Sequence, residues 1–243
     1  MKILLLLIVS LSLWANIGNI MAIKGSADIK RSGNLENAKN GMVLLKGDNI
    51  ITAKKSRVQV MLKDSTVITI GANSSFSFEE YLFDGTKNSQ LTLRANRGFF
   101  RSVTGRIGKI APERFKVKTA SATIGIRGTD FSGDISPQRE IFKCYEGAIF
   151  IEFEGDIQDL DAGMMAEILK DKFEIKKFDI TKMKVPKGLA NLQGVVLNAI
   201  NDGEVPTEVI SDVTQIIEDR ENKVDSIDDF TVSSTAEDRQ EQY

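Results

Sequence analysis

Apolar and polar residues alternate along most of this chain between residues 23 and 180, which is the pattern of half-buried β-strands. Phe115, Val117 and Thr119 would point to one side of such a strand, while Lys116 and Lys118 would point to the other. Glycine, asparagine and serine separate the short runs. This spacing predicts an all-β fold, a sandwich, barrel or roll, and not βαβ units. The predicted strands, about ten in all, cover residues 27–30, 49–52, 57–63, 66–70, 76–78, 91–95, 98–103, 115–119, 140–145 and 147–153.

Two closely spaced glycines follow one of these strands. Gly125 and Gly128 supply backbone freedom that a residue with a Cβ lacks, so we predict a tight turn or a close backbone approach between residue 125 and Phe131. Arg127 lies between the glycines. We expect the fold to hold its guanidinium through loop carbonyls or a carboxylate such as Asp130, and contact with a ligand is the alternative.

The first 22 residues have the composition of a secretory signal peptide. Lys2 gives a positively charged start, and the apolar run from Ile3 to Trp14 is too short to cross a bilayer comfortably. Cleavage is expected between Ala15 and Ala22, with a retained N-terminal anchor as the alternative. The protein is therefore predicted to be periplasmic or secreted. Later apolar runs are too short for a span, so no membrane span is expected after signal cleavage.

The pattern changes at residues 185–186. Apolar residues then recur at helical spacing, so an amphipathic helical segment is predicted over residues 186–222 and a disordered acidic tail over residues 223–243. The β domain is expected to cover residues 23–180. The second amphipathic stretch is expected either to pack on the body or to dock on a partner. Its candidate docking residues are Val209, Ile210, Val213, Ile216 and Ile217.

Charge is distributed unevenly along the chain. Residues 201–243 contain 13 acidic and 3 basic residues, a net charge of −10. Subtracting them from the chain totals of 34 and 32 leaves 21 acidic and 29 basic residues, a net charge of +8. These opposite net charges suggest the hypothesis that the acidic tail folds back over the basic body. The basic residues alternate with apolar ones, and export argues against nucleic acid as a partner; anionic cell-wall polymer or lipopolysaccharide suits such a face better.

Residues for catalysis are scarce. The chain has no histidine, which removes the commonest general base and the usual zinc ligand. Cys144 is the single cysteine and is expected to be a small buried apolar residue without a disulfide. Carboxylate pairs such as Glu152 and Glu154 alternate with apolar residues, as on an exposed strand face. We therefore predict no enzyme activity, no cofactor and no metal site, and a deep pocket lined by converging carboxylates would favour an enzyme instead.

The sequence from Phe115 to Phe131 resembles the signature of the FecR domain family, with Ala120 where proline is usual. Other elements resemble the same family in the same order, including a hairpin in which Ser65 replaces the usual glycine after its aspartate. A different turn type is expected there. The residues that match the family pattern, and to which the resemblance gives a structural role, are Gly47, Asp48, Asp64, Thr119, Ala122, Gly125, Arg127, Gly128, Thr129, Phe131, Glu146 and Gly147.

The resemblance implies an FecR-like β-roll, a double-stranded β-helix or a sandwich. Founding members of this family are inner-membrane regulators whose periplasmic part senses an outer-membrane iron transporter. The chain resembles a stand-alone exported FecR domain, which implies non-enzymatic binding or scaffolding in the cell envelope, with an envelope protein or a cell-wall polymer as partner. One alternative is a sensor that relays an envelope signal to a separate membrane anti-sigma regulator. Another is a binder of peptidoglycan or lipopolysaccharide through a basic strand face. The oligomeric state is left open.

Overall fold

A computed structural model describes residues 16–170 and 172–179. The chain divides into two units between Val185 and Pro186, and all described residues belong to the first unit. The prediction of an all-β fold is confirmed, because only a short helix, α1 (Arg106–Ile110), and a 3-10 turn, η1 (Pro112–Arg114), interrupt the strands. The strands are β1 (Asn16–Lys24), β2 (Ala27–Arg31), β3 (Asn34–Asn37), β4 (Val43–Leu45), β5 (Asn49–Thr52), β6 (Arg57–Leu62), β7 (Val67–Ile70), β8 (Ser75–Leu82), β9 (Gln90–Val103), β10 (Phe115–Lys118), β11 (Ala122–Ser136), β12 (Arg139–Phe153), β13 (Asp156–Asp161), β14 (Met164–Leu169) and β15 (Lys172–Lys177).

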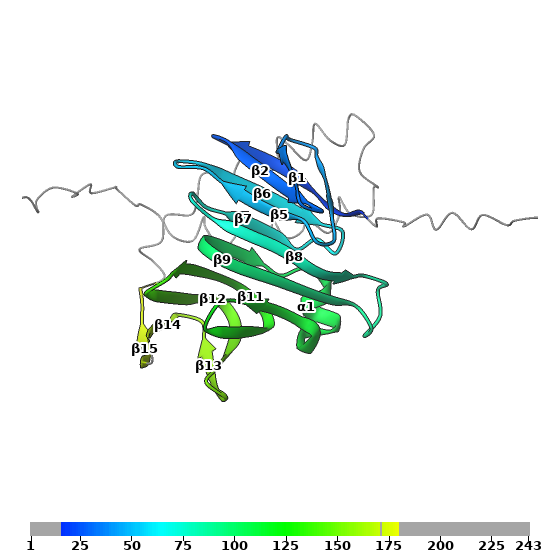
Figure 1. The fold of residues 1–243 in the computed structure, drawn as a ribbon. Helices are drawn as coiled ribbons and strands as arrows, with labels where there is room; N and C mark the ends of the chain where they lie inside the picture. The colour runs from blue at the N-terminus through cyan, green and yellow to red at the C-terminus, as the bar shows by residue number, and fades with distance from the viewer. Residues whose placement is uncertain (1–15, 171, 180–243) are drawn as a thin grey trace, which may run out of the picture. The chain divides into compact units, whose positions relative to one another are not determined.

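The strands pair in two series, which we call the first and second layers. The first layer has the order β4, β1, β6, β7, β9, β11, β12, β14, β15. The second has the order β3, β2, β5, β8, β9, β10, β11, β12, β13. Strands β9, β11 and β12 belong to both layers because each bends from one into the other. Figure 1 shows the strands stacked one after another, from β1 and β2 at the blue end to β13 and β15 at the yellow-green end.

Apolar side chains between the layers form one core. The ring centroids of Phe76 and Phe100 lie 5.4 Å apart, and those of Phe100 and Phe131 lie 5.8 Å apart. Burial alternates along the strands as the sequence predicts: Phe115 is buried, whereas the next residue is exposed. Cys144 is also buried, as predicted. The inner faces therefore supply the hydrophobic driving force, and the outer faces carry the polar residues.

The chain passes between the layers at two edges. The first edge is formed by residues 24–26, 53–56, 71–74 and the bend of β9 at Gly98. The second edge is formed by residues 46–48, residues 104–114 with α1, the bends of β11 and β12 at Gly128 and Gly147, and residues 162–163. Gly98, Gly128 and Gly147 have φ of +84°, +61° and +72°. Glycine adopts this left-handed backbone without strain, which lets a strand bend sharply.

Three long strands differ from the predicted segments. The predicted strands 91–95 and 98–103 are one strand, β9, and the predicted strands 140–145 and 147–153 are one strand, β12. No strand was predicted over the residues that form β11. In each case a glycine that is typical of a strand end lies inside a bent strand, because a positive φ redirects the chain while strand pairing continues beyond it.

The N-terminal strand begins within the predicted leader. Strand β1 starts at Asn16 and pairs with β4 and β6. Ile17 and Ile20 on this strand are 1% and 0% exposed. The described domain therefore begins at Asn16 and not at residue 23. Cleavage after Ala22 would remove most of a core strand, whereas cleavage after Ala15 would leave it whole.

The predicted helical segment 186–222, the acidic tail 223–243 and residues 1–15 lie outside the described residues. The same holds for the candidate docking residues Val209, Ile210, Val213, Ile216 and Ile217. Among the residues that the structure describes, no helix has the length and apolar composition needed to cross a membrane.

Candidate functional site

The turn between β10 and β11 is fixed by signature residues at its two ends. The Thr119 hydroxyl donates a hydrogen bond to Oε2 of Glu140 at 2.7 Å and accepts one from the Ala122 N–H at 3.0 Å. Glu140 is only 3% exposed, and Thr119 and Ala122 are buried as well. Polar groups that are buried in this way need internal partners, so Thr119 and Glu140 stabilise the turn.

Strand β11 runs through the segment between Gly125 and Phe131 without ending, so the change of chain direction predicted there takes the form of a bend within a strand. Gly128 has φ +61°, so the backbone freedom that the sequence predicts is used inside a strand. Strand β11 pairs with β10 before this glycine and with β9 after it. The signature glycine therefore marks the point at which the strand changes layers.

Two irregularities of register lie side by side at this bend. Arg127 pairs with Ala148 and Asp130 with Glu146, so β11 contains an extra residue between these pairs. Phe131 then pairs with Cys144, so the next extra residue lies in β12. The register is restored after both steps, and the two strands bend together.

Close contacts at this bend exclude side chains at two signature glycines. A Cβ at Gly147 would lie 2.0 Å from the carbonyl oxygen of Gly128. A Cβ at Gly125 would lie 2.0 Å from two ring atoms of Phe150. Contacts this short do not occur, so both positions need glycine if the backbone and the ring keep their places. These are the close approaches that the glycines predict.

Asp130 is bound by an arginine other than the expected one. Arg101 on β9 donates to Asp130 through Nε at 2.8 Å and through Nη2 at 2.7 Å. Its guanidinium also lies 4.7 Å from the centroid of the Tyr145 ring, and the Tyr145 hydroxyl lies 2.7 Å from Oγ of Ser132. The expectation that Asp130 holds Arg127 is therefore wrong, because the pairing of β9 with β11 brings Arg101 to that carboxylate.

Arg127 is exposed on the outer face of the second layer. Among residues 16–170 and 172–179 it forms no ion pair and no side-chain hydrogen bond. The neighbouring signature residues are engaged in the fold: Thr129 N–H donates to Oγ1 of Thr104 at 2.8 Å, and Phe131 is in the core. Arg127 is thus the signature residue whose side chain the described fold leaves free for a contact.

A depression of about 310 Å³ lies beside Arg127. Phe150 contributes an aromatic ring to it, and Asp159, Asp161 and Glu113 contribute carboxylates. Strand register explains the arrangement, because Arg127, Ala148 and Asp161 form one row across β11, β12 and β13. Since alternate residues on a strand share a face, Phe150 and Asp159 form the next row on the same side. The depression therefore combines both charges with an apolar surface.

Two other signature residues are buried aspartates: Asp48 forms an ion pair, and Asp64 accepts several hydrogen bonds. Asp48 is 0% exposed and receives two hydrogen bonds from Arg31, both at 2.8 Å, directly after Gly47 with φ +89°. Asp64 is also 0% exposed and accepts hydrogen bonds from the Thr66 hydroxyl at 2.7 Å and the Ile107 N–H at 3.2 Å. Both carboxylates hold connections at the second edge.

The hairpin after Asp64 keeps the left-handed backbone of a glycine turn although a serine occupies the position. Ser65 has φ +66°, so it adopts the conformation that the family's glycine would take without strain. Burial raises the pKa of Asp64, and the hydrogen bonds from Thr66 and Ile107 oppose this rise. The carboxylate links the hairpin to the start of α1 and is closed off from solvent.

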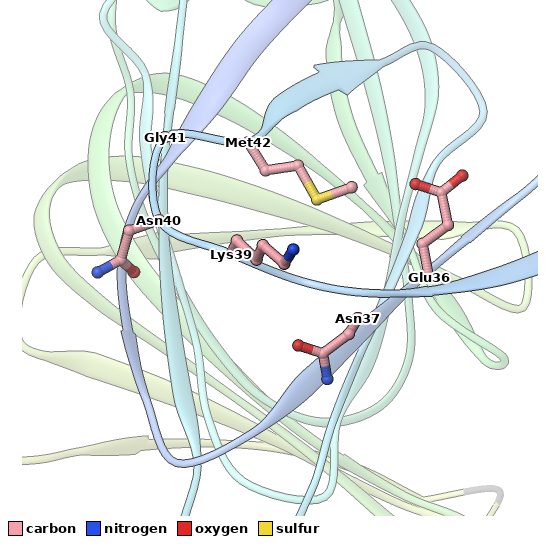
Figure 2. Close-up of a pocket in the computed structure, with 6 residues that line it drawn as sticks. All are labelled: Glu36, Asn37, Lys39, Asn40, Gly41 and Met42. Atoms are coloured by element: carbon pink, nitrogen blue, oxygen red, sulfur yellow. The ribbon is translucent and has the colours of Figure 1, made fainter.

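A larger hollow of about 580 Å³ lies next to the segment that follows β3. Figure 2 shows its lining side chains, from Glu36 and Asn37 through Lys39 and Asn40 to Met42. One stretch of chain supplies all of them, and most are exposed to solvent. The hollow brings no charged groups together from separate strands, so we place the candidate site at Arg127.

The described residues provide little for bond-breaking chemistry. No group of three or more histidine, cysteine, aspartate or glutamate residues within them is arranged to hold a metal ion. Burial raises the pKa of the Cys144 thiol to about 11, so this sulfur is protonated at neutral pH. What the depression at Arg127 offers is therefore charge and apolar contact.

Sequence reasoning did not single out Arg101, Tyr145 or Phe150. Each belongs to an ordinary alternating strand, and its role depends on which strands are neighbours. Gly125, two residues before Arg127, was the available signal for Phe150, because a glycine on a sheet surface is often covered by an aromatic ring from the next strand.

The described residues form a two-layered all-β domain in which the signature builds one edge and presents Arg127. Residues 48–150 match the family model described as FecR protein, so the chain contains a FecR domain. Two crystal structures of "a putative anti-sigma factor" from Parabacteroides distasonis resemble it at 18% and 16% identity, with TM-scores of 0.46 and 0.45. Each alignment covers 60% of this chain and less than two thirds of the other chain, 64% and 65%. A cell surface anchoring domain aligns over 25% of this chain with a TM-score of 0.25. Comparison with curated proteins gave no match.

Proposed function

We propose that this protein is a non-enzymatic binding module of the bacterial cell envelope and that it contacts a protein partner at the depression beside Arg127. The presence of a FecR domain supports a regulatory or binding role in the envelope. The observation that carries the proposal is the exposed guanidinium of Arg127 in a signature whose other members are mostly engaged in the fold. A rigid strand bend that presents an exposed charged side chain suits recognition of a partner.

The chemistry of the depression defines the partner. Arg127 suits a carboxylate, because its guanidinium can donate two parallel hydrogen bonds. Phe150 beside it suits an apolar side chain, and Asp161 suits a basic group or an N–H donor. A protein segment in which an apolar residue lies between opposite charges meets all three requirements.

The alternative of an anionic polymer on a basic strand face receives less support. Arg94 and Lys118, which lie next to each other across β9 and β10, both pair with Glu79. Arg101 is engaged by Asp130. The acidic residues of β13 also border the face. These carboxylates reduce the attraction that a phosphate-rich or carboxylate-rich polymer would feel.

Site-specific photocrosslinking in cells tests the proposal. A photoreactive residue at position 113, which also lines the depression, should capture one envelope protein, and Arg127→Glu should abolish the capture. Arg57→Glu is the matched control, because Arg57 is equally exposed but lies on β6 in the first layer. Capture that survives Arg127→Glu would contradict the proposed site. Capture of peptidoglycan or lipopolysaccharide would favour the polymer alternative, and capture of an anti-sigma regulator would favour the sensor.

A further inference from the structure

Two strand edges lie at the same end of the described domain. Within the described residues, β13 ends the second layer and pairs only with β12, and β15 ends the first layer and pairs only with β14. Figure 1 shows both strands at the yellow-green end of the stack. A strand edge presents N–H and C=O groups that need partners, so proteins usually cover or protect such edges.

Apolar side chains beside these edges are exposed as well. Ile175 on β15 pairs with the buried Ala166, so it faces the core side of the first layer, yet it is 37% exposed. Ile157 on β13 is 65% exposed. The rings of Phe153 and Phe173 stack at this end, with their centroids 5.9 Å apart. The described residues therefore leave apolar surface uncovered at the end where β13 and β15 lie.

The two edges carry opposite charges. Strand β13 contains three aspartates and no basic residue, a net charge of −3. Strand β15 contains three lysines and one glutamate, a net charge of +2. Among the described residues, the three aspartates, Lys172 and Lys177 form no ion pair. Each edge therefore repels a copy of itself and attracts a copy of the other edge.

Both strands run toward the second edge. Strand β13 leads into the crossing at residues 162–163, and β15 leads to Phe178, whose N–H donates to the Gly163 carbonyl at 2.9 Å. A twofold axis parallel to the strands keeps this direction and exchanges the two layers, so it would place β13 of one copy beside β15 of another. A twofold axis perpendicular to the layers would place each edge against its own copy. The charges favour the first arrangement.

We propose that two copies of this chain form a twofold dimer through this end, with β13 of each copy paired in parallel with β15 of the other. Asp159 aligns with Phe150, which follows the bend of β12 at Gly147 by three residues. Lys176 lies in one row with Lys143, which precedes the same bend by four residues. The two side chains thus lie at similar heights, and the pairing brings Lys176 of the second copy beside Asp159. Both ladders form together, so neither edge stays unpaired.

This inference goes beyond the proposed function and does not rest on it. The pairing uses backbone groups and charges of β13 and β15, whereas the proposed function depends on Arg127. The two meet at Asp159, which lines the depression beside Arg127. A lysine of the second copy would therefore lie at the rim of that depression. The added strands would also reduce the exposure of Ile157 and Ile175.

Charge reversal in the full-length chain tests the pairing. One variant carries Asp159→Lys and Asp161→Lys, and the other carries Lys172→Glu and Lys177→Glu. Each should raise the dissociation constant of the dimer about tenfold or more, because each places like charges across both ladders. Mixing the two variants in equal amounts should restore the dimer, since both ladders then join opposite charges. Sedimentation velocity measures the fraction of dimer in each sample.

Two further variants separate loss of pairing from loss of folding. A chain that carries all four reversals should dimerise again, because its two edges have only exchanged their charges. Asp134→Lys is the matched control and should leave the dimer unchanged, because Asp134 is exposed on β11, away from both edges. A natural chain that sediments as a monomer would overturn the proposal. Reversed variants that dimerise as well as the natural chain, or a mixture that does not, would overturn it as well.

Disulfide formation between copies gives a second readout. A mixture of Asp159→Cys and Lys176→Cys should form disulfides about tenfold faster than either variant alone, because only the mixture places two cysteines across one ladder. Cys144 is buried and does not compete. Equal rates in the mixture and in the separate variants would overturn the pairing of β13 with β15.

Discussion

The two edges carry the chain between the same two layers, but different groups hold them together. At the first edge, serine side chains fill the corners: Oγ of Ser56 accepts the Ser26 N–H at 3.0 Å, and the Ser74 hydroxyl lies 3.3 Å from the Phe99 carbonyl. At the second edge, the backbone of Gly147 lies directly on the carbonyl of Gly128. Glycines lie close to a neighbour at both edges. A Cβ at Gly98 would come closest to the Ser74 hydroxyl, at 2.2 Å, whereas a Cβ at Gly147 would come closest to the Gly128 carbonyl oxygen, at 2.0 Å.

Most residues that match the family signature lie at the second edge, whereas Thr119 and Ala122 lie at the turn between β10 and β11. A corner filled by a hydroxyl depends on a side chain that other residues can replace in part, whereas a contact between two backbones accepts glycine alone. The ion pair between Arg101 and Asp130 lies beside this contact. The second edge is therefore the more tightly specified of the two, and it is also the edge at which Arg127 is exposed.

The largest expected effect separates the two arginines of the second edge. Arg101→Gln should lower the free energy of unfolding by about 3–5 kcal/mol, because it removes the Arg101 guanidinium from the Asp130 carboxylate, which is 6% exposed. Arg127→Gln should change it by less than about 0.5 kcal/mol, since Arg127 is exposed. Urea denaturation of both variants measures the difference. Similar losses would mean that Arg127 also has a structural role.

Adding a methyl group to the backbone contact should have the next largest effect. Gly147→Ala is expected to cost about 3 kcal/mol or more, because φ is +72° and the new Cβ would meet the Gly128 carbonyl. Gly155→Ala is the matched control: its φ is +89°, but a Cβ there would meet no atom within 4 Å. Only the backbone strain of about 1–2 kcal/mol applies to it. Thermal unfolding compares the two, and equal costs would remove the close contact as the reason for the signature glycine.

The first edge should respond more weakly to loss of a side chain. Ser74→Ala removes hydrogen bonds from the hydroxyl to the carbonyls of Ala72 and Phe99, at 3.2 and 3.3 Å. These are long, neutral hydrogen bonds, so a loss of about 1 kcal/mol is expected. Ser121→Ala is the control and should be nearly neutral, because Ser121 is exposed and its hydroxyl forms no hydrogen bond among the described residues. A loss at Ser74 as large as that for Gly147→Ala would contradict the contrast between the edges.

The buried carboxylate of Asp64 makes the second edge sensitive to pH. Burial raises its pKa, so the folded protein holds this proton more tightly than the unfolded chain does. The stability that this bound proton gives to the folded protein is fully present at pH values below the ordinary pKa of an aspartate, about 4. It is lost as the pH rises through the pKa that Asp64 has in the folded protein. The stability advantage of the natural protein over Asp64→Asn should therefore shrink as pH rises. Urea denaturation from pH 3 to 8 measures it, and an advantage that grows with pH would show that the ionised form is preferred.

The sequence predicts the strands better than their continuity. Alternation locates the inward positions of β10, such as Phe115 and Val117, because burial on one face is a local property of a strand. It cannot show that Gly98 and Gly147 bend strands without ending them. A positive φ is compatible with both outcomes, and the neighbouring strands decide between them.

The candidate site depends still more on distant pairing. Arg127 and Asp130 are near each other in sequence, which suggested their ion pair, but the bulge after Gly128 separates them. Arg101 reaches Asp130 from 29 residues away because β9 lies beside β11. The ring of Phe150 covers Gly125 from the neighbouring strand. This contact could not be predicted either, because the sequence does not show which strands are neighbours.

The smallest expected effect concerns two threonines that lie together at the second edge. Oγ1 of Thr129 is buried and has no hydrogen-bond partner among the described residues, so Thr129→Val should be neutral or stabilise by up to about 1 kcal/mol. Oγ1 of Thr104 instead accepts the Thr129 N–H at 2.8 Å and donates to the Thr129 carbonyl at 3.0 Å. Thr104→Val should therefore cost about 1–2 kcal/mol, because it leaves a strand N–H without its partner. Urea denaturation of the two variants compares them. If Thr129→Val cost as much as Thr104→Val, the hydroxyl of the signature threonine would have to contribute to the stability of the second edge.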